Sequence, residues 1–212
     1  MKIADTLGGY QSQTIKSQNT EDYIMFLGYI VMAFPIIAVM SLFIFLPVLL
    51  NDKFHQRKRS IIRYIVLYTF IGYCMSLLYL TILWYYPNIT FHPKYRLINL
   101  HPFIWISETY EMGFRRMIQQ LVLNIGMYVP YGLLLPTVFK RLRNISIHIV
   151  VVLLTTLSIE TMQYIIGRSA DIDDVIMNFL GGLLGYFLFK IINHIFLKKF
   201  WWCEITNNDV DK

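Results

Sequence analysis

Seven side chains able to do chemistry lie close together in a short stretch of an otherwise apolar sequence. They are Glu160, Gln163, Arg168, Asp171, Asp173, Asp174 and Asn178. Carboxylates can act as acids or bases or hold a hard cation, a guanidinium can pair with phosphate or carboxylate, and amides can orient polar groups. With Asn124 from an earlier segment, these residues predict a ligand-binding cluster.

The composition places this cluster in a membrane protein. Hydrophobic residues make up 56% of the 212-residue chain and charged residues 15%, whereas soluble domains carry about 25% charged residues. About 20 apolar residues span a bilayer, and five apolar runs are at least that long. They cover residues 23–50, 61–86, 118–139, 145–166 and 175–197. We therefore expect an all-α, polytopic membrane helical bundle.

The segment before the third run has a different pattern. Phe103, Ile106, Tyr110, Phe114 and Met117 recur at three- and four-residue spacing. This spacing predicts an amphipathic helix lying in the membrane surface. The alternative is an ordinary loop helix that packs on the bundle.

Four regions follow from these runs: a polar tail at 1–22, two transmembrane helices within 23–86, a domain at 95–197, and a cytoplasmic tail at 198–212. Cytoplasmic loops of membrane proteins are rich in Lys and Arg. An outside N-terminus leaves twelve of these residues on the cytoplasmic side and seven on the other. The sequence therefore predicts an outside N-terminus and a cytoplasmic C-terminus. The same rule explains the net charge of +6, so we expect no nucleic-acid partner.

The depth of three polar residues indicates a shared site. Glu160, Asn124 and Asn178 each lie about five or six residues below the outer end of their runs, which is roughly 7–9 Å at 1.5 Å per residue. Isolated polar groups at that depth are costly and tend to face one another. Below Asn178, Gly181 and Gly185 share its face and predict a close approach by a neighbouring helix.

Structural roles explain some of the same residues. Asp171, Asp173 and Asp174 suit the first turn of a helix, where they cap exposed amides, and they are also weak candidates for a metal site. Glu160 and Asn178 can act as hydrogen-bonding links between helices. The alternatives of caps and links alone, or a working site, stay open on this evidence.

Five spaced motifs resemble the VanZ-like family. They are Glu160-x-x-Gln163, Arg168-x-x-Asp171-x-Asp173-Asp174, Asn178-x-x-Gly181-x-x-x-Gly185, Asn99-Leu-His-Pro102-Phe103 and Asn124-x-x-x-x-x-Pro130-x-Gly132. The resemblance covers about residues 95–195 and leaves the first two apolar runs outside. It implies a multi-pass protein of the bacterial plasma membrane, associated with reduced sensitivity to the glycopeptide teicoplanin. Within these motifs we expect Asn99, Pro102, Pro130, Gly132, Gly181 and Gly185 to be structural.

Three functions remain. The first is a non-enzymatic protein whose outer cluster binds a lipid-linked cell-wall precursor or a lipoglycopeptide-like ligand, with the lipid bilayer as its other partner. The second is an enzyme acting on a lipid-anchored envelope substrate, with Glu160 as acid or base. The third is a structural or partner-binding subunit. We expect no cofactor.

Overall fold

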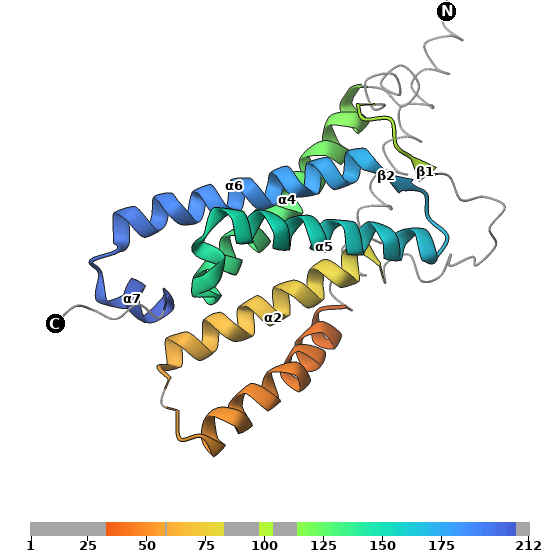
Figure 1. The fold of residues 1–212 in the computed structure, drawn as a ribbon. Helices are drawn as coiled ribbons and strands as arrows, with labels where there is room; N and C mark the ends of the chain where they lie inside the picture. The colour runs from red at the N-terminus through yellow and green to blue at the C-terminus, as the bar shows by residue number, and fades with distance from the viewer. Residues whose placement is uncertain (1–32, 58, 83–97, 104–113, 207–212) are drawn as a thin grey trace, which may run out of the picture.

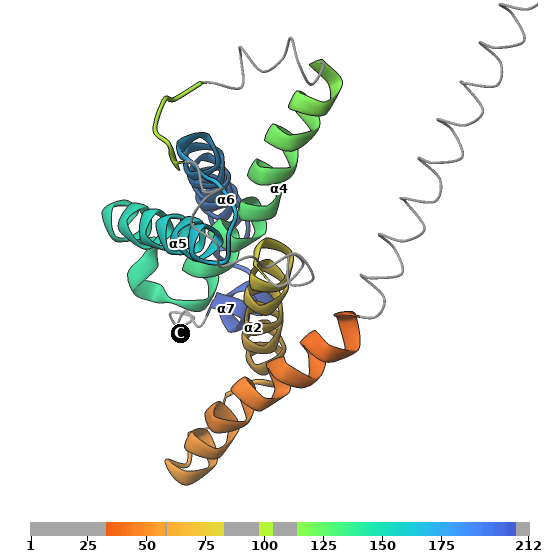
Figure 2. The same cartoon turned by 90° about the vertical axis from the view of Figure 1, so that its right-hand side faces the viewer.

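The chain forms a bundle of long helices (Figure 1, Figure 2). The computed structural model describes residues 33–57, 59–82, 98–103 and 114–206. Five helices in these ranges are long and apolar enough to cross a membrane. They are Ala33–Phe54, α2 (Ile61–Thr81), the Leu121–Val138 part of α4 (Phe114–Val138), α5 (Ile145–Ile165) and α6 (Ile172–Phe196). The prediction of an all-α membrane bundle is confirmed.

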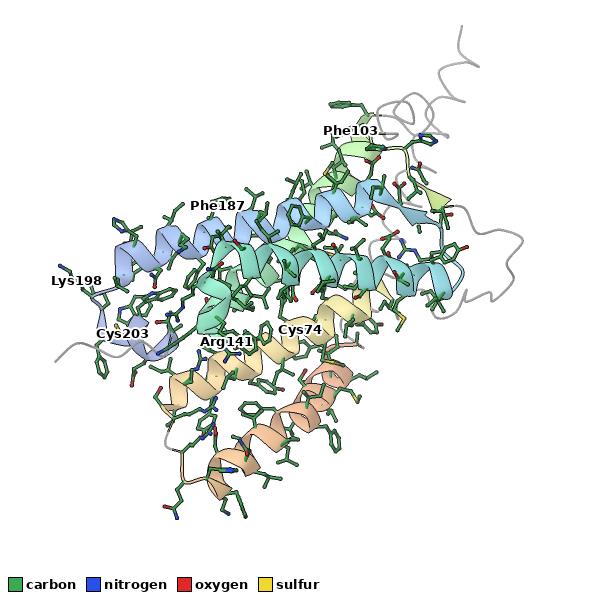
Figure 3. The ribbon with its side chains drawn as sticks, in the orientation of Figure 1. Cys74, Phe103, Arg141, Phe187, Lys198 and Cys203 are labelled. Atoms are coloured by element: carbon green, nitrogen blue, oxygen red, sulfur yellow. The ribbon has the colours of Figure 1, made fainter. Side chains whose placement is uncertain are left out.

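The bundle has two chemically different ends. We call the end where α2 and α5 finish and α6 begins the polar end, because it holds Glu160, Arg168 and Asp171. The opposite end, where α4 and α6 finish and α2 and α5 begin, is called the basic end. Figure 3 shows Phe103 at the polar end and Lys198 and Cys203 at the basic end.

The start of α4 bears on the predicted interfacial helix. Helix α4 runs without a break from Phe114 to Val138, so Phe114 and Met117 continue directly into the apolar span that begins at Leu121. The rest of the predicted interfacial helix, residues 104–113, lies outside the described residues, as do the tail 1–22 and the ends of the first two apolar runs at 23–32 and 83–86. Pro130 and Pro136 lie inside α4 without ending it, as membrane helices allow when neighbours bind the freed carbonyl groups.

Helices α4 and α6 pack closely through glycine. A Cβ at Gly181 would overlap the carbonyl oxygen of Ile125, and a Cβ at Gly185 would overlap that of Val129. From the other side, a Cβ at Gly132 would overlap the carbonyl oxygen of Gly182. The close approach predicted for Gly181 and Gly185 is confirmed, and α4 is the helix that makes it.

Two arginines hold the basic end together. The Arg63 side chain is 7% exposed and donates hydrogen bonds to the carbonyl oxygens of Thr137 (3.1 Å), Val138 (2.5 Å) and Ile205 (2.7 Å). Arg143 donates to the carbonyl oxygen of Thr206 at 2.6 Å, and burial lowers the pKa of its guanidinium, which nevertheless stays charged at neutral pH.

These bonds dock a helix that the sequence did not predict. The expected tail at 198–212 contains α7 (Phe200–Thr206), which follows α6 directly. Its Trp202 donates from the indole nitrogen to Asn193 of α6 at 2.9 Å. The two arginines therefore bind the C-terminal carbonyls of α4 and α7, where the helix dipole favours positive charge.

Candidate functional site

The turn between α5 and α6 is held by Glu160. Helix α5 ends at Ile165, Gly167 takes a left-handed conformation (φ 100°), and the chain returns through the short strand β2 (Ala170–Asp171). There the backbone N–H of Asp171 donates to Oε1 of Glu160 at 2.7 Å. Glu160 is only 6% exposed, so this buried carboxylate fixes the start of α6 against the end of α5.

Asp171 has two structural partners. Its Oδ1 accepts from the backbone N–H of Asp173 at 2.9 Å, which makes Asp171 the N-cap of α6. The same oxygen accepts from the Asn99 side-chain amide at 3.2 Å. Asn99 belongs to β1 (Ile98–Asn99), which pairs in parallel with β2. The cap explains why α6 begins at Ile172, three residues before the predicted start.

Asp173 binds the segment that contains Asn99 at a later residue of that segment, Phe103. Its Oδ1 accepts from the backbone N–H of Phe103 at 2.7 Å, and Phe103 has a left-handed backbone (φ 67°). Pro102 forms part of the turn that precedes it. The motif from Asn99 to Phe103 is thus attached by two adjacent carboxylates to the start of α6, in keeping with the structural roles expected of Asn99 and Pro102.

Asn124 reaches the cluster from α4. Its side-chain amide donates to Oδ1 of Asp174 at 2.6 Å. The sequence predicted that Asn124 would lie level with Asn178, but Asn178 is one helical turn further into the bundle than Asp174.

Gln163 and Arg168 connect the cluster to α2. The Gln163 amide and the Arg168 guanidinium both donate to the carbonyl oxygen of Thr81, the last residue of α2, at 3.0 and 3.2 Å. Arg168 also interacts electrostatically with Glu160 and Asp174. Nothing in the sequence indicated this role for Gln163, because its partner is a backbone atom.

Three buried polar atoms in this region have no hydrogen-bond partner among the described residues: Oε2 of Glu160, Oδ1 of Asn178 and the hydroxyl of Tyr128. Asn178 is 6% exposed and Tyr128 is fully buried. Buried polar atoms are normally paired, with protein or with bound water. Tyr128 was missed by the sequence reasoning, since a tyrosine in an apolar run is ordinarily a packing residue.

A cavity of about 220 Å³ opens beside Glu160. Its polar lining comes from Asn99, Glu160, Thr161, Tyr164 and Asp171. Its apolar lining comes from Ile98, Leu100, Leu157, Ala170, Ile172 and Val175. The cavity therefore lies between β1, the last turns of α5, β2 and the first turn of α6. Its lining combines carboxylate residues with an apolar wall.

The structure gives no support to the weak metal candidates. Asp171, Asp173 and Asp174 turn to different partners, namely Asn99, the Phe103 backbone and Asn124. Within the described ranges no group of three His, Cys, Asp or Glu residues is arranged to hold a metal ion.

The chain was compared with known proteins. A family model described as VanZ/LLP1 matches residues 66–193. Protein VanZ of Enterococcus faecium is 35% identical over 131 residues, which cover 60% of this chain and 75% of that protein. No solved structure matches the chain. The matched range takes in most of α2 as well, so the similarity extends further towards the N-terminus than the five motifs indicated.

Proposed function

The chain belongs to the VanZ/LLP1 family, and from that premise we propose that it is a bacterial plasma-membrane protein that binds a lipid-linked or lipophilic ligand at its polar end. The observation that carries this proposal is the cavity beside Glu160, with one carboxylate oxygen left without a partner among the described residues. Links between helices alone do not account for a cavity with both polar and apolar lining between β1, α5, β2 and α6.

The polar end is proposed to face the outside of the cell. Among the described residues, Lys53, Arg57, Lys140, Arg141 and Lys198 are some of the basic residues at or beside the basic end, while Arg115, Arg116 and Arg168 lie at the polar end. Positive charge next to membrane spans favours the cytoplasmic side. The C-terminus is then cytoplasmic and the N-terminus outside. A reporter active only in the cytoplasm, fused after Lys212, tests this orientation, and an inactive fusion at normal abundance argues against it.

The biological role proposed for this binding is reduced sensitivity to teicoplanin. A ligand held at the outer surface, either a lipid-linked cell-wall precursor or the lipophilic drug itself, changes how much drug meets its target. Ile98, Asn99 and Leu100 form one wall of the cavity, and the side chains of Ile98 and Leu100 are exposed. These features suit a ligand that is partly apolar.

Glu160 favours a second candidate function. A buried carboxylate with one oxygen bonded and the other directed to no partner among the described residues has the arrangement of a general acid or base. The protein would then be a membrane-embedded enzyme acting on a lipid-anchored envelope substrate. Loss of function with the isosteric change Glu160→Gln, but retention of ligand binding, would favour this candidate.

The test is substitution in cells. Glu160→Gln, Arg168→Ala and Asn178→Ala are made singly, membrane abundance is measured, and teicoplanin sensitivity is compared with that of the unaltered chain. Glu204→Gln is the matched control, because it removes the same charge in α7 at the basic end. We expect the three cluster variants to be more sensitive to teicoplanin than the unaltered chain. The control variant should have the same sensitivity as the unaltered chain. Equal sensitivity at equal abundance throughout would refute the resistance role.

A further inference from the structure

Another cavity, larger than the one at the polar end, lies between α2 and α5, which run side by side (Figure 1). Its volume is about 490 Å³, and it shares no lining residue with the first cavity. The α2 side of the lining runs from Cys74 to Ile82, and the α5 side runs from Val151 to Met162. Tyr131 of α4 lies between the two sides. Three helices that cross the membrane therefore build this cavity.

The cavity has the form of a groove in the side of the bundle. Its floor is buried, since Leu77, Tyr131 and Ile159 are 4%, 7% and 3% exposed. Its edges are open, since Leu154 and Met162 are 58% and 51% exposed. Because these positions belong to membrane-spanning helices, the groove is continuous with the lipid-facing surface of the bundle. The medium that reaches it is the hydrocarbon of the bilayer.

The hydroxyl groups in the lining are hydrogen-bonded within the protein. Thr155 donates to the carbonyl oxygen of Val151 at 2.8 Å, and Ser158 donates to that of Leu154 at 2.7 Å. The Tyr131 hydroxyl lies 2.9 Å from Oγ1 of Thr155 and forms a hydrogen bond with it. A buried polar group needs a partner, and these groups already have one. An occupant of the groove therefore needs no polar group, which suits a hydrocarbon chain.

The dimensions of the groove match one such chain. From Val151 to Met162 the groove follows α5 for about 16 Å at 1.5 Å per residue. One leaflet occupies about half of a hydrocarbon core that is roughly 30 Å thick. A volume of about 490 Å³ over that length gives a width of about 6 Å. Carbon atoms pack at about 4 Å from one another, so a single chain fits, whereas a helix about 10 Å across does not.

We propose that one acyl chain of a bilayer phospholipid lies in the groove between α2 and α5. Its head group lies beyond Met162 and Ile82, because both sides of the lining reach towards the polar end. Leaving the bilayer for the groove gives the chain no hydrophobic gain, so the binding comes from close packing against the buried floor. This lipid site is independent of the cavity beside Glu160 and goes beyond the function proposed above.

The first experiment uses the full, unaltered chain released from detergent micelles, with bound phospholipid counted by native mass spectrometry. The probes are phosphatidylcholine and phosphatidylglycerol with sixteen-carbon chains, and phosphatidylcholine with eight-carbon chains. We expect one sixteen-carbon lipid to be retained per chain with either head group. Retention of the eight-carbon lipid should be at least about five-fold lower, because its shorter chains make fewer packing contacts. No retained lipid, equal retention of both chain lengths, or retention that follows only the head group overturns the proposal.

The second experiment places the lipid in the groove. Leu154→Trp puts a larger side chain into the lining, and Leu153→Trp is the matched control, because Leu153 is the neighbouring exposed leucine and does not line the groove. We expect Leu154→Trp to lower retention of the sixteen-carbon phosphatidylcholine at least about five-fold, and Leu153→Trp to leave it unchanged. Circular dichroism checks that each variant is folded. If Leu154→Trp is unfolded, Ser158→Leu is compared with the control in its place. Equal retention in the folded groove variant and the control overturns the proposal.

Two other outcomes assign the groove or the lipid differently. A dimer that Leu154→Trp disrupts, without a retained lipid, assigns the groove to a second copy of the chain and overturns the proposal. Loss of the lipid in Glu160→Gln but not in Leu154→Trp places it in the other cavity, which also overturns the proposal but supports ligand binding at the polar end. Lipid retention that depends on Leu154 while teicoplanin sensitivity is the same in every cluster variant leaves the groove standing and refutes the resistance role.

Discussion

Replacing Gly185 by alanine should destabilise the bundle, whereas the same replacement at Gly126 should not. A Cβ at Gly185 would overlap the carbonyl oxygen of Val129 and approach the backbone nitrogen of Leu133 at 2.7 Å. Both atoms belong to the α4 backbone, so relief requires the two helices to separate. At Gly126, which lies in the same membrane helix α4, a Cβ meets nothing within 4 Å.

The magnitude follows from two opposing effects. Overpacking a close contact typically costs about 1–3 kcal/mol, whereas alanine gains about 1 kcal/mol of helix propensity over glycine. We expect Gly185→Ala to lower the free energy of unfolding by about 2 kcal/mol relative to Gly126→Ala, or about thirty-fold in the folding equilibrium. Gly72→Ala, whose Cβ would make an ordinary 3.7 Å contact with Ser41 Oγ, should behave like Gly126→Ala.

The assay is reversible unfolding in mixed micelles of dodecyl sulfate, followed by circular dichroism. Each variant is compared with the unaltered chain at the same micelle composition. Equal stability of the Gly185 and Gly126 variants would show that α4 and α6 do not meet through glycine. The alignment of Asn124 with Asp174 depends on that packing, so it would lose its support as well.

Three other changes test the polar and basic ends. A double-mutant cycle of Asn124→Leu and Asp174→Asn should give a coupling energy of about 1 kcal/mol in the same unfolding assay, and additive effects would argue against the 2.6 Å bond. Asp171→Ala should lower the free energy of unfolding by about 1 kcal/mol through loss of the α6 cap, while Asp171→Asn should retain most of that stability. Equal stability of Asp171→Ala and the unaltered chain would argue against the cap. Arg63→Met should speed proteolytic cleavage near α7 and lower stability by about 3 kcal/mol, whereas the exposed Arg57→Met should do neither; equal cleavage rates would contradict the docking of α7 by Arg63.

Much of the architecture was predictable from the sequence. The five apolar runs identified the membrane helices, because length and composition alone decide whether a segment can cross a bilayer. The glycines of α6 indicated a close helix contact. Asp171 was a natural cap, since an aspartate before an apolar run bonds to the free amides of its own helix. Each of these inferences depends on neighbours along the chain.

Other features depended on partners distant in sequence. Gln163 and Arg168 bind the carbonyl oxygen of Thr81, and Arg63 binds the carbonyl oxygens at the ends of α4 and α7. Every residue has such an oxygen, so no residue type marks the partner. The two-residue pairing of β1 with β2 is likewise too short to leave an alternating pattern.

The polar residues themselves were visible in the sequence, but their pairing was not. Residue types and spacing placed Asn124, Glu160 and Asp174 near one membrane surface. Their partners depend on the rotation and axial shift of α4, α5 and α6, which glycine contacts such as those of Gly181 and Gly185 with α4 help to set. One helical turn of shift paired Asn124 with Asp174 instead of Asn178. The same packing left Glu160 Oε2 without a donor in the described residues. It also formed the cavity lined by Glu160, which depends on several elements and is contained in no single segment.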